Sequence, residues 1–165
     1  MSDNQGRSEP FILFKIADIT FGVPSHAVEQ LEMIGEITPV PNAPDFVDGV
    51  VSSRGRVIPA INLRARLGLE RIPYNLQTRL IILCAGERTV GLIVDSAREF
   101  IFIPTEAIQP PPEELSGLSG DYLEGIANLE DRLVCILNVN EVLDWADGYG
   151  PSSTSTTTEP REAST

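Results

Sequence analysis

The stretch Asp45-Phe-Val-Asp-Gly-Val-Val-Ser-Ser-Arg-Gly-Arg-Val-Ile-Pro-Ala-Ile-Asn-Leu-Arg-Ala-Arg-Leu67 specifies the structural unit on which this chain is built. Residues 47–53 are β-branched and apolar with one glycine, which predicts a partly buried strand. Arg54-Gly55 interrupts this strand, and Gly55 can supply the positive φ that a two-residue hairpin needs. Residues 57–61 form the returning strand, and Asn62 caps a short helix that ends at Gly68.

The same pattern occurs a second time. At a shift of 76 positions, Asp45-Phe-Val-Asp-Gly-Val aligns with Asp121-Tyr-Leu-Glu-Gly-Ile, and Asn62-Leu aligns with Asn138-Val. Upstream, at a shift of 69, Thr20-Phe-Gly-Val aligns with Thr89-Val-Gly-Leu. The match covers about 57 residues in each half and keeps the apolar pattern, glycines and helix caps in one order. The chain is therefore predicted to contain two copies of one small β unit.

Each half is expected to hold about five short strands with closely spaced turns, which favours closure into a small barrel. A unit of about 65 residues would be marginal alone, so the halves should share a core. We therefore predict a mainly β fold of two tandem five-stranded barrels with a few short helices. The expected ranges are a disordered N-terminus at 1–9, barrels at about 20–70 (plus strand exchange) and 78–147, and a disordered Ser/Thr-rich tail at 148–165.

The remaining elements are predicted from local patterns. A short helix should begin near Ser25, because Ala27, Val28, Leu31 and Ile34 would then share a buried face. The last helix, at 138–145, should begin with Asn138 and Glu141 as a capping box, and Trp145 should close the end of a barrel. Strands are expected at 11–16, 19–23, 78–85 and 89–102, an extended segment at 37–40 and a link between the halves at 71–77.

Charge and composition exclude several classes of function. A formal net charge of −12 opposes unassisted binding to nucleic acid or to an anionic membrane. No apolar run has the length of a membrane span and the polar start is unlike a secretory signal, so a cytoplasmic location is expected. Cys84 and Cys135 lie within apolar strands without metal-ligand spacing. They are expected to be reduced, buried thiols, and no metal or cofactor is predicted.

Several segments together resemble the CheW-like family, the coupling proteins of bacterial chemosensory arrays. The resemblance runs in family order from about Phe11 to Trp145, and its most specific part is the Arg54-Gly-Arg-Val-Ile-Pro run. The segments are Phe21-Gly-Val-Pro, Ile37-Thr-Pro-Val-Pro, Gly49-Val-Val-Ser-Ser-Arg-Gly-Arg-Val-Ile-Pro-Ala-Ile-Asn-Leu-Arg, Val90-Gly-Leu-Ile-Val-Asp, Pro110-Pro-Pro and Tyr122-Leu-Glu-Gly-Ile. The chain departs from the family pattern at Ser52-Ser53, where Asn-Leu is usual, and at Gln30, where Glu is frequent.

The resemblance implies two SH3-like barrels, no catalysis and an adaptor role. The adaptor would link the cytoplasmic tips of chemoreceptors (methyl-accepting chemotaxis proteins) to a CheA-type histidine kinase whose regulatory domain has the same fold. It would reach the membrane arrays only through these partners, and it would make weak, ring-forming contacts with itself or the kinase. A related alternative is the scaffold of a non-flagellar system that controls pili or gene expression.

Arg54 is the main candidate for a partner contact. The matching arginine of the family is implicated in receptor coupling. The equivalent hairpin tip of the second half is Glu130-Asp131, and the fold alone would not demand this reversal of charge. The resemblance further implies receptor contacts at Gly55, Gln30 and Leu31, and kinase contacts at Ile12, Ser25 and Val28. Val28 and Ile12 are equally compatible with a plain core role, and core is favoured for Leu31.

Other polar residues receive plainer interpretations. Arg64 and Arg66 fall in the first turn of a helix, where a solvated face is slightly favoured. A small-barrel enzyme or ligand carrier would have to use His26, Asp95 and Glu99, but no clustered nucleophile, acid or base supports it, and Asp95 is expected to end a strand. A nucleic-acid-binding barrel is opposed by the acidity of the chain and by its few aromatic residues.

Overall fold

The computed structural model describes residues 7–115 and 119–144. Eleven strands dominate these residues, and the helices are single turns. The strands are β1 (Ser8–Ile16), β2 (Ile19–Pro24), β3 (Val28–Met33), β4 (Val47–Ser53), β5 (Arg56–Asn62), β6 (Arg79–Ala85), β7 (Arg88–Val94), β8 (Ser96–Pro104), β9 (Ile108–Gln109), β10 (Leu123–Asn128) and β11 (Leu133–Leu137). The helices are α1 (Leu63–Arg66), α2 (Val139–Val142) and the 3-10 turns η1 (Ser25–Ala27), η2 (Thr105–Ala107), η3 (Glu113–Leu115) and η4 (Ser119–Tyr122).

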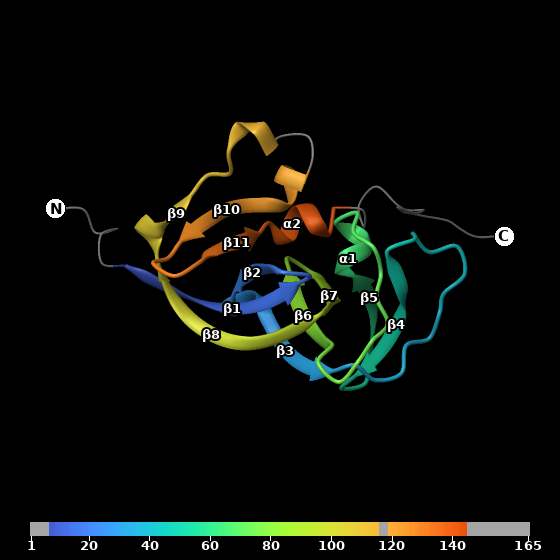
Figure 1. The fold of residues 1–165 in the computed structure, drawn as a ribbon. Coiled ribbons are helices and arrows are strands. Elements are labelled where there is room, and N and C mark those ends of the chain that lie inside the picture. The colour runs from blue at the N-terminus through green and yellow to red at the C-terminus, as the bar shows by residue number, and fades with distance from the viewer. Residues whose placement is uncertain (1–6, 116–118, 145–165) are drawn as a thin grey trace.

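Two sheets form the two barrels, and each sheet takes strands from both halves of the chain. The first barrel has the order β3-β6-β7-β5-β4, and the second has the order β8-β1-β2-β11-β10-β9. The hairpin β1–β2 thus belongs with the second half, and the hairpin β6–β7 belongs with the first (Figure 1). Parallel pairing joins each exchanged hairpin to the sheet of the other half. β2 of the first hairpin pairs with β11, and β7 of the second hairpin pairs with β5.

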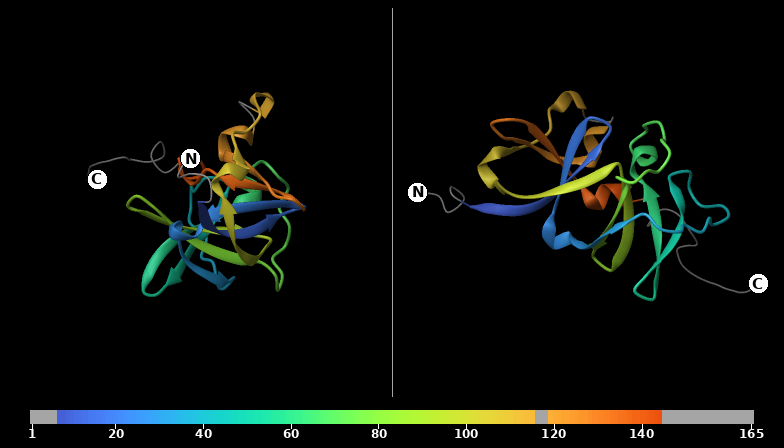
Figure 2. Two further views of the ribbon diagram at one scale, coloured as in Figure 1. Left: turned by 90° about the vertical axis from the view of Figure 1, so that its left-hand side faces the viewer. Right: turned by 60° about the horizontal axis from the view of Figure 1, so that its bottom comes forward.

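This exchange corrects the expected ranges of the barrels. The expected ranges of about 20–70 and 78–147 allowed for strand exchange, but they placed β2 in the first barrel and β6 and β7 in the second. In the structure, β2 belongs to the sheet of the second barrel, and β6 and β7 belong to the sheet of the first. The second barrel also has six strands instead of five, because η2 separates β8 from the two-residue β9. In Figure 2, right, β4 and β5 lie at the opposite end of the molecule from β9 and β10.

The geometry confirms the sequence repeat in detail. Bulges interrupt the pairing of β3 with β6 between Val28 and Gln30, and the pairing of β8 with β1 at the equivalent Ala97 and Glu99. The side chains of Asn62 and Asn138 both accept a hydrogen bond from the amide three residues later, at 3.1 and 3.2 Å. The asparagine caps therefore act identically in both copies, as predicted. The capping box expected at Asn138 and Glu141 is not completed, because the amide of Asn138 donates to the carbonyl oxygen of Tyr122 instead of the Glu141 side chain.

Three clusters of buried apolar residues make up the core. One fills the second barrel around Leu13, Ile103 and Ile136, and another fills the first barrel around Ile58, Leu80 and Ile82. The largest lies between the barrels and draws on β1, β2, β5, β6, β7, β11, α1 and α2. Its members are Phe14, Ile16, Phe21, Val23, Ile61, Leu63, Ile81, Leu83, Val90, Leu92, Val94, Leu137, Val142 and Leu143. The two halves share a core, as predicted.

Three expected elements differ from the structure. The helix near Ser25 is only the turn η1, and Val28 to Met33 form strand β3, because pairing with β6 of the other half overrides the helical spacing. Leu31 is consequently 43% exposed instead of buried. The long strand at 89–102 breaks at Asp95 into β7 and β8, and β1 begins at Ser8, inside the range expected to be disordered. The expectations for Trp145 and for the tail from 148 concern residues outside those described.

Candidate partner-binding surfaces

The hairpin tip between β4 and β5 presents Arg54 to solvent. Arg54 and Gly55 have φ values of 54° and 80°, so both central residues of the turn are left-handed. This is the two-residue hairpin geometry that Gly55 predicted. A non-glycine residue in this conformation costs roughly 1–2 kcal/mol. The arginine side chain therefore occupies a position where the backbone alone would favour glycine.

Strand β3 lies beside this tip and is joined to it by side chains. Ser53 Oγ donates a hydrogen bond of 2.8 Å to Glu32 Oε2, and Arg56 forms an ion pair with Glu29. The Arg56 guanidinium is the main reason that the pKa of Glu29 lies below its usual range. Gln30 is half-buried on β3, and its side-chain amide donates to the same oxygen of Glu32. These contacts place the β3 segment that carries Gln30 and Leu31 beside the hairpin that carries Arg54 and Gly55, the four residues expected to meet a receptor.

The residues expected to meet the kinase lie where β1 and β3 pass between the barrels. Ile12 pairs with Val23 of β2 and is half-buried against the inter-barrel cluster. Val28 also packs on that cluster and pairs with Leu83 of β6. Ser25 begins η1, the turn that links β2 to β3 and contacts β1. All three side chains are partly exposed, and Ile12 and Val28 also pack on the core.

Arg66 connects the two barrels, and the expectation of a solvated face is wrong for it. Its guanidinium lies over the ring of Phe46 at 4.5 Å and over that of Tyr122 at 5.2 Å. These two aromatic residues are equivalents in the repeat. Arg66 also donates to the carbonyl oxygens of Val142 and Glu141, at 2.9 and 3.3 Å. The positive charge therefore lies against the C-terminal carbonyls of α2, where the helix dipole favours it.

Arg64 is likewise structural. It forms an ion pair with Asp95 at 2.7 Å, and the two side chains are only 15% and 20% exposed. The interaction with Asp95 raises the pKa of Arg64 above its usual value. Asp95 also accepts a hydrogen bond of 2.7 Å from the amide of Ala17 in the β1–β2 turn. Asp95 therefore ends β7, as expected, and also fixes α1 and the exchanged hairpin.

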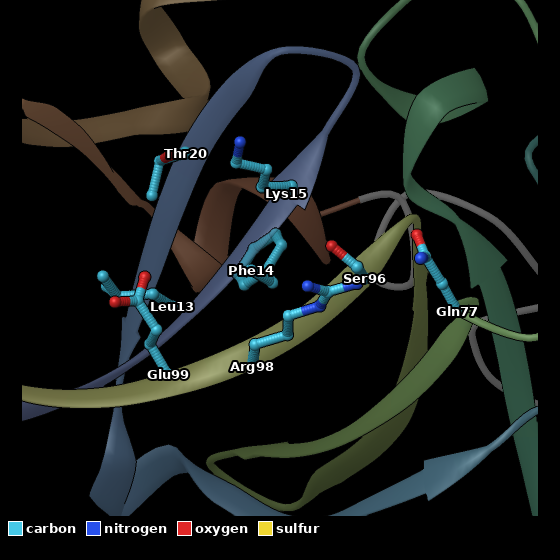
Figure 3. A pocket seen from close by; sticks show the side chains of 8 residues that line it. All are labelled: Leu13, Phe14, Lys15, Thr20, Gln77, Ser96, Arg98 and Glu99. Carbon is cyan, nitrogen blue, oxygen red and sulfur yellow. The ribbon is translucent and has the colours of Figure 1, made fainter.

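The structure does not bring together the residues of the enzyme alternative. His26 is exposed and lies 3.5 Å from the Glu9 carboxylate, while Asp95 and Glu99 are held by Arg64 and Arg132. His26, Asp95 and Glu99 each line a different surface hollow, so they do not share one site. The hollow at Glu99 has about 260 Å³ and is open to solvent, and Figure 3 shows Lys15 and Arg98 among the side chains that line it. Among the described residues no cluster of His, Cys, Asp or Glu could hold a metal ion.

Both cysteines are free thiols and are half-buried, which is less than the full burial expected. Burial raises the pKa of the Cys135 thiol. Cys84 lies 3.6 Å from Glu29 and 3.5 Å from the Thr89 hydroxyl.

Sequence reasoning missed an exposed aromatic pair on β8. Phe100 and Phe102 are 55% and 61% exposed, and their rings meet edge to face at 5.8 Å. At the shift of 69 they match Leu31 and Met33, which are 43% and 60% exposed on β3. The repeat and the alternation of a strand would have been enough to find this equivalence. Each barrel therefore exposes two apolar side chains on the equivalent edge strand, β3 in the first barrel and β8 in the second.

An ion pair on the second barrel gives a prediction for acid stability. Arg132 holds the pKa of Glu99 below its usual range and lies 2.7 Å from it. A folded-state pKa that is depressed adds stability above the ordinary pKa of a glutamate, and this stability is lost as the pH falls through the folded value. Glu99 is 46% exposed, so solvent should limit the effect to below about 1 kcal/mol. Urea unfolding of Glu99→Gln should differ from wild type at neutral pH and converge with it in acid; a constant difference would contradict the prediction.

Comparison with known proteins identifies the family. The family model described as a CheW-like domain matches residues 10–147. The chain therefore belongs to the CheW-like family.

Within residues 7–115 and 119–144, the structure contains no helix with the length and apolar character of a membrane span.

Individual relatives are similar over most of the chain. The chemotaxis protein CheW of Helicobacter pylori is 37% identical over 134 residues, covering 81% of this chain and 80% of its own. Protein FrzA of Myxococcus xanthus is 32% identical over 146 residues, covering 86% and 90%. The crystal structure of the scaffolding protein TtCheW from Thermoanaerobacter tengcongensis superposes with a TM-score of 0.78 at 28% identity, covering 84% of this chain and 94% of that one.

Proposed function

We propose that this protein is a non-catalytic adaptor that couples chemoreceptors to a CheA-type histidine kinase. Membership of the CheW-like family supports the adaptor role, and the exposed Arg54 at the β4–β5 hairpin tip supports the receptor contact. An exposed arginine occupies a left-handed turn position beside an edge strand with an exposed leucine. This combination suits recognition of an acidic partner surface more than it suits folding. The receptor contacts are Arg54, Gly55, Gln30 and Leu31.

The kinase contacts are Ile12, Ser25 and Val28, which meet the regulatory domain of the kinase. They lie between the barrels, on the side of the inter-barrel cluster formed by β1 and β3. Because the two hairpin tips carry opposite charge, Arg54 against Glu130 and Asp131, contacts between like-folded domains can run head to tail and close into rings. The protein works in the cytoplasm and reaches membrane arrays through its partners.

Substitution of Arg54 tests the receptor contact. Arg54→Glu should weaken binding to the cytoplasmic tip of a chemoreceptor from the same organism at least about tenfold. The substitution replaces attraction between Arg54 and an acidic receptor surface with repulsion. Arg54→Gly should also weaken binding, yet it should raise the melting temperature or leave it unchanged, because it relieves a left-handed residue. The measurements are surface plasmon resonance for binding and calorimetry for stability.

Glu130→Arg at the equivalent tip of the second barrel is the matched control and should leave receptor binding unchanged. If both Arg54 variants bind like wild type while their melting temperatures fall, the arginine is structural and the proposed contact is wrong.

A further inference from the structure

The first barrel has a seam where β3 and β4, the two ends of its sheet, meet without a backbone ladder. Past the end of β3, the bridge between Thr38 and Val50 links the returning chain to β4. At the seam itself, the contact is made by side chains. Glu32 Oε2 accepts hydrogen bonds from Ser53 Oγ and from Gln30 Nε2. Ser53 is only 4% exposed, while Glu32 and Gln30 are half-buried, so this polar contact is partly shielded from water.

The second barrel shows that the fold does not require a polar seam. The equivalents of Glu32 and Ser53 there are Ile101 and Leu129, which both pack on the apolar core of that barrel. A buried polar network often contributes little to stability compared with apolar residues of similar volume, but it fixes geometry because hydrogen bonds are directional. The polar version therefore points to a role in placing neighbouring groups.

The residues next to this seam belong to the proposed receptor-binding surface. Ser53 immediately precedes Arg54 at the hairpin tip, and Gln30 precedes the exposed Leu31 on β3. Glu32 connects the two segments through one carboxylate oxygen. One N–H of the Gln30 amide is donated to Glu32, which fixes the orientation of the amide and leaves its oxygen Oε1 able to accept a bond from a partner.

We propose that Glu32, with Ser53 and Gln30, is the positioning residue of the receptor-binding surface. It holds the Arg54 guanidinium and the Gln30 amide oxygen in one arrangement, which selects a receptor tip that offers a carboxylate opposite the first and a hydrogen-bond donor opposite the second. This proposal rests on the proposed function, because it assigns the specificity of the same surface.

Transplanting the second-barrel seam tests the proposal. Glu32→Ile and Ser53→Leu should each lower the melting temperature, since each leaves a polar partner unsatisfied. The double variant Glu32→Ile/Ser53→Leu should recover the melting temperature of wild type or exceed it. It should nevertheless bind the cytoplasmic tip of a chemoreceptor from the same organism about tenfold more weakly, because Gln30 and Arg54 have lost their common anchor. A purely structural role would not separate binding from stability in this way.

Conservative variants cover the case in which the double variant does not fold. Ser53→Thr keeps the hydroxyl and should bind the receptor tip like wild type. Ser53→Ala removes the donor to Glu32 and should bind more weakly, with a smaller fall in melting temperature than Ser53→Leu because it adds no bulk at a buried position. If the folded double variant, or Ser53→Ala, binds as tightly as wild type, the seam is structural and the inference is overturned. If wild type itself does not bind the receptor tip, the proposed function fails, and this inference fails with it.

Discussion

Arg66→Met should lower the free energy of unfolding by about 3 kcal/mol, the combined loss of a desolvated cation–π contact and of hydrogen bonds from a charged donor. Arg66 lies between the rings of Phe46 and Tyr122 and donates to two carbonyls of α2, so its removal loosens both barrels at once. A protein of this size should then melt about 10 °C lower. Differential scanning calorimetry with chemical denaturation measures both quantities.

Arg98→Met is the matched control for this prediction. Arg98 is exposed on β8 and faces an open hollow, so its loss should change the melting temperature by about 1 °C at most. Arg66→Lys should give an intermediate loss, because an ammonium keeps the charge but lacks the planar fork that meets two carbonyls. Equal melting temperatures for Arg66→Met and Arg98→Met would show that Arg66 does not hold the barrels together.

Val28→Arg should weaken binding to the kinase regulatory domain about 100-fold or more, because an unpaired guanidinium would enter an apolar contact. Val28 is only half-buried, and the stem of an arginine can lie along the surface with its charged end in water. The variant should therefore stay folded. Titration calorimetry measures the affinity, and sedimentation velocity should show wild type and variant as monomers in dilute solution, since ring contacts are weak one at a time.

Val40→Arg is the control for Val28→Arg. Val40 is 42% exposed in a loop away from the proposed contact, so the kinase domain should bind this variant normally. A tight two-fold dimer of the wild-type protein that survives Val28→Arg would rule out the head-to-tail arrangement, because such a dimer uses one surface on both copies.

The sequence predicts those features of this protein whose chemistry is local. Both helix caps and the left-handed Gly55 follow from short motifs, and the structure confirms them. The repeat also predicts that equivalent parts have equivalent geometry, which the matching bulges of β3 and β8 confirm. The shared core follows from size, since neither half could bury enough apolar surface alone.

Most of the failures involve partners distant in the sequence. Val28 to Met33 have helical spacing, but the strand that pairs with them belongs to the other half. The role of Arg66 was missed because its acceptors are 75 and 76 positions away and are backbone carbonyls, which carry no sequence signal. For the candidate surfaces, the sequence names Arg54 and Gln30, but only the structure shows that Glu32 links Gln30 to Ser53, the residue before Arg54.

The exchange of hairpins between the halves has a consequence for how this chain folds. Phe21 of β2 pairs with Cys135 of β11, 114 positions later, so the second barrel cannot close until nearly the whole domain has left the ribosome. Contacts of such long sequence separation make folding slow, because loop closure must precede the stabilising pairings. A single copy of the unit with this strand pairing would complete a barrel only by exchanging its hairpin with a second molecule, as in a domain-swapped dimer. In this chain the same exchange takes place within one molecule.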